Sequence, residues 1–397
     1  MLKRLRFVEI ICLLLVFGEI IYVCYSLFWN NTRYLYFDSI NAIDRGNGYY
    51  VAVGSNNNNS NHYERASIAT YNKKREKRFE KLYNIGYNSA FFDVVVDENN
   101  IVAVGSYEKT LKDHDSLQRK ALIVKYDVQG NVIFQKDFQL LDNSRFTRVQ
   151  IVDDGYLVVG QSIYKNTKVG SKNGGAVLAK YDKDGNLMWQ KTYGDNKFGS
   201  FNDLLVVEDY IYVVGVAENC VDVLCKYDLD GNLCFCSEYK TVGGEGFSSI
   251  VSSDDRIYVS GSKKSGDAIS AVIVMYDLEG SYISEVAVDD SKNTTYNKLI
   301  IDNYGYIVAI GGIFDVDVFN KNADNYNLDG IVGKYTLDLE KIMVVSYEHD
   351  RNDFFTDIIC NDGEYLVAGY SLYEDDVYLS KFIRYSEALK VLAVESS

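Results

Sequence analysis

The residue types that most often carry chemistry, cysteine, histidine and clustered acids, are sparse and unevenly placed in this sequence. Cys12 and Cys24 lie in an apolar N-terminal segment, and the five cysteines that follow it are Cys220, Cys225, Cys234, Cys236 and Cys360. Five is an odd number, so these cannot all pair with one another. No zinc site is predicted, because the sequence has no pair of C-x-x-C motifs.

Cys225 and Cys360 lie in apolar runs, at positions that small core residues such as Val124 and Val152 hold elsewhere in the chain. Both are therefore interpreted as buried core thiols. Cys225 and Cys234 fall on strands that are predicted to pair, so they could approach each other. A glycine bulge between those strands would shift their register by one residue, which argues against a disulfide.

The three histidines, His62, His114 and His349, all fall in predicted loops, and acids such as Asp113 and Glu348 flank two of them. Imidazole and carboxylate are common metal ligands, so a metal site shared by these loops is one interpretation. Loop tips on different structural repeats are often too far apart to share an ion. We interpret the histidines as exposed polar residues and predict no metal.

The densest group of side-chain oxygens lies in residues 313–329. Such loops can hold calcium, but the EF-hand spacing is absent, with no Gly in the sixth place and no Glu in the twelfth. Long loops on a rigid scaffold are frequent recognition sites. The candidate binding residues are therefore Phe314, Asp315, Asp317, Phe319, Asp324, Tyr326 and Asp329. No nucleophile–base arrangement and no phosphate-binding glycine loop occurs, so we predict no catalytic residue and no cofactor.

An internal repeat positions these residues, and it covers almost everything after residue 35. Seven times a β-rich run ends in glycine, at Gly54, Gly105, Gly160, Gly215, Gly261, Gly311 and Gly369. Seven times a later run ends in tyrosine, at Tyr71, Tyr126, Tyr181, Tyr227, Tyr276, Tyr335 and Tyr385. A period of about 50 residues with four strands in each unit is the signature of a β-propeller.

The predicted fold is all-β, a seven-bladed propeller of four-stranded antiparallel blades over residues 36–397. The predicted blades are 36–87, 88–143, 144–199, 200–245, 246–293, 294–351 and 352–397. In each blade, strand B ends at the repeated glycine and strand C at the repeated tyrosine. The B–C loops and the connections from strand D to the next strand A are expected to share one face. Blade 7 is expected to contain only its own four strands and to close the ring by packing against blade 1.

The turn between strands C and D has a recognisable pattern in blades 2 to 5. It has Asp first and Gly fourth, in residues 127–130, 182–185, 228–231 and 277–280. This pattern is typical of a type I turn closed by a glycine bulge. Blades 1, 6 and 7 lack the glycine, so we expect their C–D turns to differ.

These repeats resemble the bacterial seven-bladed β-propeller repeats of the SBBP type and, more loosely, kelch repeats. Residues 181–189 are also similar to the repeat of quinone-cofactor propellers. Trp189, however, is the only tryptophan after the N-terminal segment, and Phe134 and Phe235 hold the matching place in nearby repeats. The resemblance implies a scaffold that serves many functions, and it carries over no active site.

The N-terminus reads as a membrane anchor. Residues 1–6 are basic and predicted to be cytoplasmic, and residues 7–29 form an apolar run long enough to span a bilayer. Glu19 costs roughly 3 kcal/mol on the insertion scale, while the twelve Leu, Ile, Val and Phe residues of 10–29 gain about 5 kcal/mol in total. A cleaved signal peptide is the alternative, but no small-x-small cleavage site follows. Residues 30–35 would be a linker, and Glu19 could pair with a polar group on another helix.

The net charge of −15 argues against a nucleic-acid partner. The absence of proline beside abundant Asn, Lys, Tyr and Ile suggests an AT-rich, bacterial genome. The predicted function is a single-pass, membrane-anchored, extracytoplasmic module that binds a protein or glycan or serves as a scaffold. The alternative is a cell-surface glycan-active enzyme with a site on the propeller axis. Acids and aromatics clustered in a deep axial pocket would favour the enzyme.

Overall fold

The computed structural model describes residues 39–396, except for positions 57–63, 75, 84, 111–116, 164–173, 194–198, 218–220, 240–245, 266–267, 289–291, 315–327, 348–351, 362, 373–377, 387–388 and 390. Every regular element in this part of the chain is a β-strand. None of the described residues belongs to a helix long and apolar enough to cross a bilayer. The predicted anchor at 7–29 lies outside the described residues.

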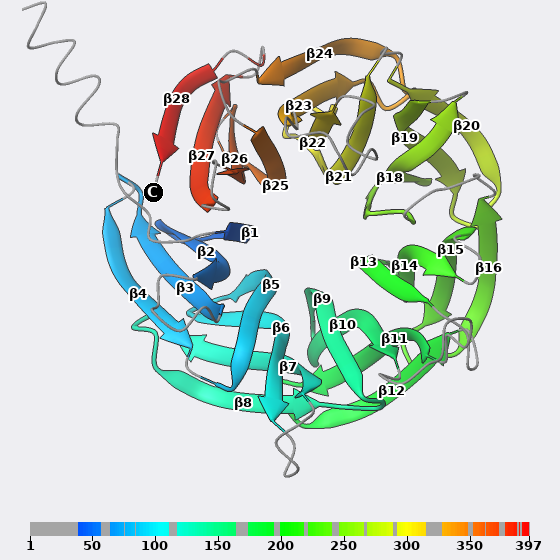
Figure 1. Ribbon diagram of the computed structural model, residues 1–397. Coiled ribbons are helices and arrows are strands. Elements are labelled where there is room, and N and C mark those ends of the chain that lie inside the picture. The colour runs from blue at the N-terminus through cyan, green and yellow to red at the C-terminus, as the bar shows by residue number, and fades with distance from the viewer. Residues whose placement is uncertain are drawn as a thin grey trace, which may run out of the picture.

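The strands form repeated antiparallel units in which consecutive strands pair in order from the centre of a ring to its rim (Figure 1). The innermost strands, in position A, are β1 (Ser39–Gly46), β5 (Tyr87–Asp97), β9 (Asn143–Val152), β13 (Ser200–Val207), β17 (Ser249–Ser253), β21 (Asn293–Ile301) and β25 (Asn352–Asn361). Position B is held by β2 (Tyr49–Asn56), β6 (Asn100–Thr110), β10 (Gly155–Ile163), β14 (Tyr210–Ala217), β18 (Arg256–Ser265), β22 (Ile307–Phe314) and β26 (Glu364–Leu372).

Position C is held by β3 (Arg65–Asn72), β7 (Leu117–Asp127), β11 (Gly174–Asp182), β15 (Val221–Asp228), β19 (Ala268–Asp277), β23 (Leu328–Tyr335) and β27 (Tyr378–Ser386). The outermost strands, in position D, are β4 (Lys77–Tyr83), β8 (Val132–Phe138), β12 (Leu187–Tyr193), β16 (Leu233–Tyr239), β20 (Tyr282–Ala287), β24 (Lys341–Tyr347) and β28 (Val391–Ser396). Five sheets have four strands. An eight-stranded sheet joins the units β5–β8 and β9–β12 through one parallel bridge between Arg119 and Asn143. The predicted all-β propeller of four-stranded antiparallel blades is thus confirmed in its architecture.

The repeated tyrosines and glycines have clear packing roles. Most of the tyrosines lie edge-on against the aromatic side chain of strand A in the same blade, as Tyr181 does against Phe146, with ring centroids 6.1 Å apart and an interplanar angle of 80°. Edge-to-face pairs add to the stabilisation that burial provides. Gly160 faces the backbone of strand A so closely that an added Cβ would lie 2.0 Å from the Arg145 carbonyl oxygen. The glycine therefore permits close approach of two backbones at the centre of a blade.

That close approach coincides with a β-bulge in the inner strand. The register slips at Asn41, Phe92, Thr147, Asn202, Asn297 and Thr356. Polar side chains at the bulge position reach the neighbouring blade and donate a hydrogen bond to the carbonyl of its inner-strand core residue, as Thr147 does to Phe201 at 2.8 Å. Equivalent bonds run from Asn41, Asn202, Ser248, Asn297 and Thr356. The residue at the bulge therefore bends its own strand and also connects its blade to the next one.

The same contact closes the ring. Thr356 Oγ1 of β25 donates to the Ile40 carbonyl of β1 at 2.7 Å, and the Ile43 backbone N–H donates to the Asp357 carboxylate at 2.8 Å. The last unit draws its outer strand, β28, from the C-terminal end of the chain. These observations agree with the prediction that the first and last blades close the ring by packing, without sharing strands.

The C–D turns of blades 2 to 5 have the predicted geometry. In the first, the Gly130 N–H donates to the Asp127 carbonyl at 2.9 Å, Gly130 has a φ of 77°, and the Asp127 side chain accepts from the Asn131 N–H. The prediction that the turns without glycine would differ is wrong for blades 6 and 7. Leu339 and Leu389 hold the glycine position with φ of 65° and 52° and donate the same hydrogen bond. Both leucine side chains are buried, and burial offsets the strain of about 1–2 kcal/mol.

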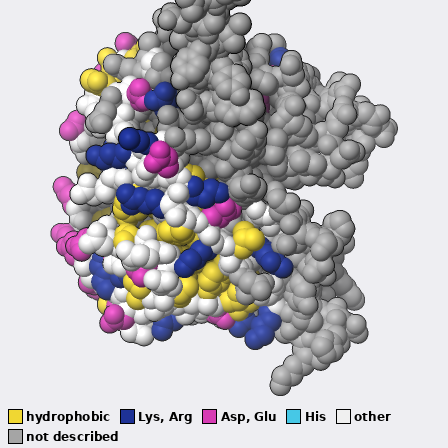
Figure 2. All heavy atoms as spheres, turned by 90° about the vertical axis from the view of Figure 1, so that its left-hand side faces the viewer, with side chains coloured by type: hydrophobic (Ala, Val, Ile, Leu, Met, Phe, Trp, Pro, Cys, Tyr) yellow, Lys and Arg dark blue, Asp and Glu magenta, His cyan; other side chains and the backbone are white. Residues whose placement is uncertain are grey.

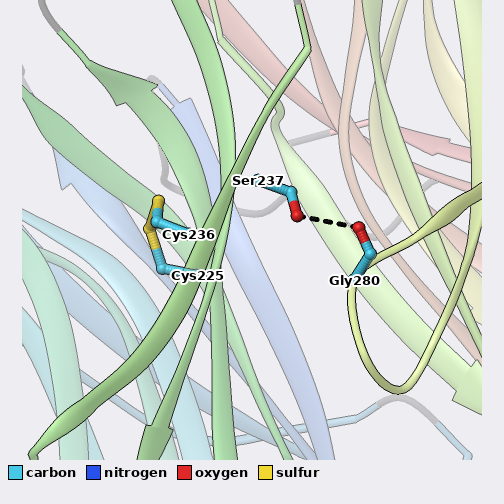
Figure 3. Close-up of a disulfide and its surroundings, with 4 residues drawn as sticks. All are labelled: Cys225, Cys236, Ser237 and Gly280. Carbon is cyan, nitrogen blue, oxygen red and sulfur yellow. Dashed lines mark hydrogen bonds between the residues drawn. A yellow bond between two sulfur atoms is a disulfide. The ribbon is translucent and has the colours of Figure 1, made fainter.

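The interpretation of Cys225 as an unpaired thiol is also wrong. Cys225 is fully buried, as predicted, but it forms a disulfide with Cys236 of the neighbouring strand (Figure 3). The bulge between Lys226 and Tyr227 sets the register of β15 and β16 so that Cys225 lies directly opposite Cys236. The bulge, which argued against pairing with Cys234, is thus what brings Cys236 into place. Cys234 is exposed and free, and Cys360 is a half-buried free thiol beside the core of the last blade.

Candidate binding site

The structure has two faces of different character. The A–B and C–D turns lie on one, which we call the turn face. The strand ends that lead into the B–C and D–A connections lie on the other, which we call the loop face. Four C–D turns on the turn face repeat the same hydrogen bond, in which the N–H of Gly130, Gly185, Gly231 or Gly280 donates to the carbonyl of the turn Asp. The rim between the faces, seen in Figure 2 from the side of β4, mixes hydrophobic side chains with Lys and Arg.

Two of the predicted binding residues are described, and both belong to strands of the loop face. Phe314 ends β22 opposite Leu328, and Asp329 lies in β23 opposite Ile313. Asp329 is only 5% exposed, so it is a sheet residue and not part of an exposed loop. The other predicted residues, Asp315, Asp317, Phe319, Asp324 and Tyr326, lie outside the described residues.

The candidate metal ligands lie mostly outside the described residues as well. All three histidines fall in undescribed segments, as does most of the oxygen-rich segment considered for calcium. Among the residues that the structure places, no group of three or more His, Cys, Asp or Glu side chains could hold a metal ion.

The loop face contains a half-open hollow of about 310 Å³ between the second and third blades. Its walls come from strand ends that meet on this face: the end of β6, the start of β7, the start of β9 and the end of β10. Arg119, Arg145 and Glu108 are its charged residues, and Asn143, Gln161 and Ile163 are among its other lining residues. The sequence analysis did not single out this site, because its residues are scattered over 56 positions from Glu108 to Ile163 and only the sheets unite them.

The two arginines of the hollow differ in their partners. Arg119 Nη2 pairs with Glu108 Oε1 at 2.7 Å, and Glu108 also accepts from Asn88 at 2.8 Å. The Nε atoms of Arg119 and Arg145 are both buried without a hydrogen-bond partner among the described residues. The two arginines differ in that Arg145 forms no ion pair with a described residue. Burial lowers the pKa of Arg145, and the nearby charge of Arg119 lowers it further. Arg119 and Glu108 neutralise each other, so Arg145 leaves the hollow with one uncompensated positive charge.

The inner strands surround the centre of the ring (Figure 1). In several of them, the residue that follows the bulge belongs to a second charged cluster. Lys298 Nζ is 3.3 Å from Asp203 Oδ2, and Arg148 Nε is 3.7 Å from Asp203 Oδ1. Asp93 and Asp357 complete the cluster. These carboxylates also accept backbone N–H groups of the next blade, from Val149 to Asp93 at 2.8 Å and from Ile250 to Asp203 at 3.2 Å.

The three axial carboxylates titrate differently. Burial raises the pKa of Asp93 to about 7, although Arg148 and Lys298 act to lower it. Burial also raises the pKa of Asp357. Burial acts to raise the pKa of Asp203 too, but the charges of Lys298 and Arg148 outweigh it and hold that pKa below the usual value. Since Asp93 and Asp203 are only 9% and 4% exposed, the cluster reads first as a structural network that joins the inner strands.

Comparisons with known proteins identify the fold and nothing finer. No family model matches the chain, and no curated protein matches it either. A solved structure of Sqt1 from Chaetomium thermophilum has 11% identity and a TM-score of 0.50, with 90% of this chain and 99% of that chain covered. The β-propeller domain of a protease from Pyrococcus furiosus has 10% identity and a TM-score of 0.47, with 86% of this chain and 93% of that one covered. A prolyl endopeptidase has 12% identity and a TM-score of 0.49, and the match covers 89% of this chain but 55% of that enzyme.

The β-propeller architecture of the chain rests on its own strand order, in which four-stranded antiparallel units form a ring. At identities this low, the similarity extends to the fold alone. The resemblance to the bacterial SBBP-type repeats stays a prediction.

Proposed function

We propose that the chain is a seven-bladed β-propeller, tethered to the membrane by residues 7–29, that binds a protein or glycan outside the cytoplasm through its loop face. The observation that carries this proposal is the contrast between the two faces. Tight, repeated turns cover the turn face, whereas the loop face has connections of very different length and a hollow with an uncompensated arginine. Recognition sites concentrate in variable connections on rigid scaffolds.

Two further observations support parts of the proposal. The blade-to-blade hydrogen bond from the bulge position recurs at six places around the ring, and Phe92 holds that position in the second blade, which supports a count of seven blades. The Cys225–Cys236 disulfide supports an oxidising compartment, because disulfides are rare in the cytosol. The anchor itself rests on the apolar run of the sequence.

The orientation is tested by adding protease outside intact cells that carry the full chain. We expect the propeller to be cleaved from the membrane, since the basic residues 1–6 should stay in the cytoplasm. Protection of the propeller, under conditions in which a known external marker is digested, would show that the orientation is wrong.

The loop face is tested by capture of partners with the full anchored chain. One variant replaces residues 315–327 by a four-residue turn and keeps the Phe314–Leu328 strand pair. Shortening the loop changes its closure free energy by about 1 kcal/mol, so folding should persist. The matched control reverses two exposed charges on the turn face, Asp184→Lys and Asp230→Lys. We expect the first variant to lose captured partners and the second to keep them. Equal capture by all three proteins would remove this loop from the binding surface.

A glycan-active enzyme with an axial site is the second candidate. Its acid and base would be axial carboxylates, because acid–base pairs have divergent pKa values such as those of Asp93 and Asp203. The burial of both groups and their bonds to backbone N–H groups favour the binding module instead. The enzyme would require that Asp93→Asn and Asp203→Asn each abolish release of sugar from cell-surface glycan while the protein stays folded.

A further inference from the structure

The hollow between the second and third blades combines features of a built anion site. Its charged groups are two guanidiniums and one carboxylate, in a protein whose net charge is −15. A strongly acidic surface repels anions, so a local excess of positive charge on it is unexpected from composition alone. Arg145 lines this hollow without an ion-pair partner among the described residues, whereas Arg119 pairs with Glu108. A guanidinium group that is partly buried and has no counter-ion is costly unless a ligand pairs with it.

We propose that this hollow binds the carboxylate of a hydroxylated monoacid about the size of one sugar ring, with Arg145 as the residue that pairs with the carboxylate. This inference rests on the proposal that the loop face is the binding face, and it names the class of ligand.

The charge balance of the hollow favours a ligand that carries a single negative charge. Among the described residues that line the hollow, Glu108 neutralises Arg119 at 2.7 Å, which leaves Arg145 to be matched. A monoanion restores neutrality, whereas a dianion such as phosphate would leave a surplus negative charge in a half-buried site. The planar guanidinium also fits a carboxylate with two parallel hydrogen bonds.

The uncharged residues that line the hollow indicate what the ligand carries besides its carboxylate. Asn143 and Gln161 bring amide groups that can bond to hydroxyls, and Ile163 brings an apolar surface. An amino acid fits less well, because its ammonium group would need an acid and the one acid that lines the hollow, Glu108, already serves Arg119 and Asn88. The volume of about 310 Å³ lies at the small end of ligand sites, which suits one ring and not a long chain.

Position in the repeat explains why the site occurs once in the described residues. Arg145 precedes the core residue Phe146 of its inner strand, and the matching positions before Ile40, Phe91, Phe201, Phe247, Tyr296 and Phe355 hold Ser39, Ala90, Ser200, Gly246, Thr295 and Phe354. None of those side chains carries a charge. The hollow is therefore a local addition to one blade and not a feature that the scaffold repeats.

The test is calorimetric titration of the full chain in detergent with glucuronate, glucose and inorganic phosphate as probes. We expect saturable binding of glucuronate, with glucose and phosphate at least about tenfold weaker. Arg145→Gln should weaken glucuronate binding about tenfold or more. Arg145→Lys should recover part of that loss, because lysine keeps the positive charge but cannot make the two parallel hydrogen bonds of a guanidinium. The matched control is Arg256→Gln, which makes the same change on the turn face, where Arg256 pairs with Asp338; it should bind as wild type.

Ile163→Trp fills the hollow without changing a charge and should abolish binding even if Arg145→Gln fails to fold. No binding of glucuronate by the folded wild type would overturn the inference, as would equal binding of phosphate or undiminished binding by Arg145→Gln or Ile163→Trp. These results are separate from those of the loop exchange at 315–327. If the exchange abolishes partner capture while glucuronate does not bind, the loop face stands and the carboxylate site falls.

Discussion

At the scale of single residues, three consecutive positions in the inner strand have different roles. The core residue before the bulge packs inside its own blade, the bulge residue bonds to the next blade, and the residue after it faces the axis. In the third blade these are Phe146, Thr147 and Arg148. Phe92 shows the cost of departing from the pattern, because phenylalanine has no donor for the carbonyl of the next blade. The residue after the bulge, which faces the axis, differs in charge from blade to blade, as Asp93, Arg148 and Lys298 show.

The titration of Asp93 predicts a pH dependence of stability. Folding raises its pKa from the ordinary 3.8 to about 7, so the folded state holds a proton that the unfolded state releases above about pH 4. The free energy of unfolding should therefore fall as pH rises from about 4 to about 7, by up to roughly 1 kcal/mol per pH unit, and level off above. Asp357 and Asp44, whose pKa values are also raised, act in the same direction.

Asp93→Asn keeps an oxygen that can accept from Val149 but cannot titrate. Urea unfolding at pH 5 and at pH 7.5 should show a smaller difference for this variant than for wild type. Asp153→Asn, the same change at an exposed position, is the control and should leave the difference unchanged. An identical difference in wild type and Asp93→Asn would show that Asp93 is ionised throughout this range.

At the scale of elements, the C–D turn depends on the strand that covers it. In blades 3 and 5 the turn glycine lies under an aromatic ring from strand D of the preceding blade, and a Cβ on Gly185 would lie 2.7 Å from the ring of Phe134. The residue at the same register before the turn of blade 6 is Ser284, which is small, and there Leu339 replaces the glycine. In blade 6 we therefore expect the Leu339 side chain to occupy the space that an aromatic ring fills above a turn glycine.

This exchange predicts a compensating pair of substitutions. Leu339→Gly removes backbone strain of about 1 kcal/mol but loses a buried side chain, so we expect a net destabilisation of about 2 kcal/mol. Adding Ser284→Phe should restore most of that loss by covering the new glycine. Thermal unfolding of the two single variants and the double variant measures the coupling. Simple additivity of the two effects would show that the aromatic ring and the leucine are not interchangeable.

The Cys225–Cys236 bond gives a second prediction for an element. In denatured, non-reduced protein, thiol titration should find two fewer free thiols than in reduced protein. The bridge spans a sequence separation of 11 residues, and reduction should lower the free energy of unfolding by about 2–3 kcal/mol. Cys234→Ser, which removes the exposed free thiol of the same strand, should leave both results unaltered apart from one fewer thiol. Equal thiol counts with and without reductant would contradict the pairing.

At the scale of the whole molecule, the ring is closed by the contact that also joins its other blades. Thr356 and Thr147 are a matched pair. Each donates to a core carbonyl in the next blade, at 2.7 and 2.8 Å, and each also reaches a carbonyl of its own blade at 3.2 Å. They differ in that Thr356 joins the last blade to the first, whereas Thr147 joins blades adjacent in the chain.

Replacing either threonine by valine keeps the shape and removes the donor, so each should destabilise the protein by about 1 kcal/mol or somewhat more. Urea unfolding of the full chain compares Thr356→Val with Thr147→Val. Similar losses would indicate that the closing interface is equivalent to the others. A loss confined to Thr147→Val would show that other contacts hold the first and last blades together.

The sequence by itself determined the all-β architecture and the repeated unit of this protein, because both follow from local periodicity. Alternating apolar residues, a glycine where two backbones meet and a tyrosine that packs on the inner strand recur in every unit, and each signal lies within a few residues of its neighbours in the chain. The Asp-to-Gly turns were readable for the same reason. The expectation for turns without glycine failed because it considered the backbone preference of leucine and not the burial of its side chain against another blade.

Only the tertiary structure decided which distant residues meet. Cys225 pairs with Cys236 because the bulge at the C–D turn sets the register of β15 and β16. The sequence predicted the bulge but not which cysteine it brings opposite Cys225. Arg145 and Glu108 line one hollow, and Asp203 meets Lys298 across the axis, because the ring places strands from different repeats side by side. Contacts of this kind depend on register, bulges and ring closure together. They carry no periodic signal, because each occurs once in an otherwise repeated scaffold.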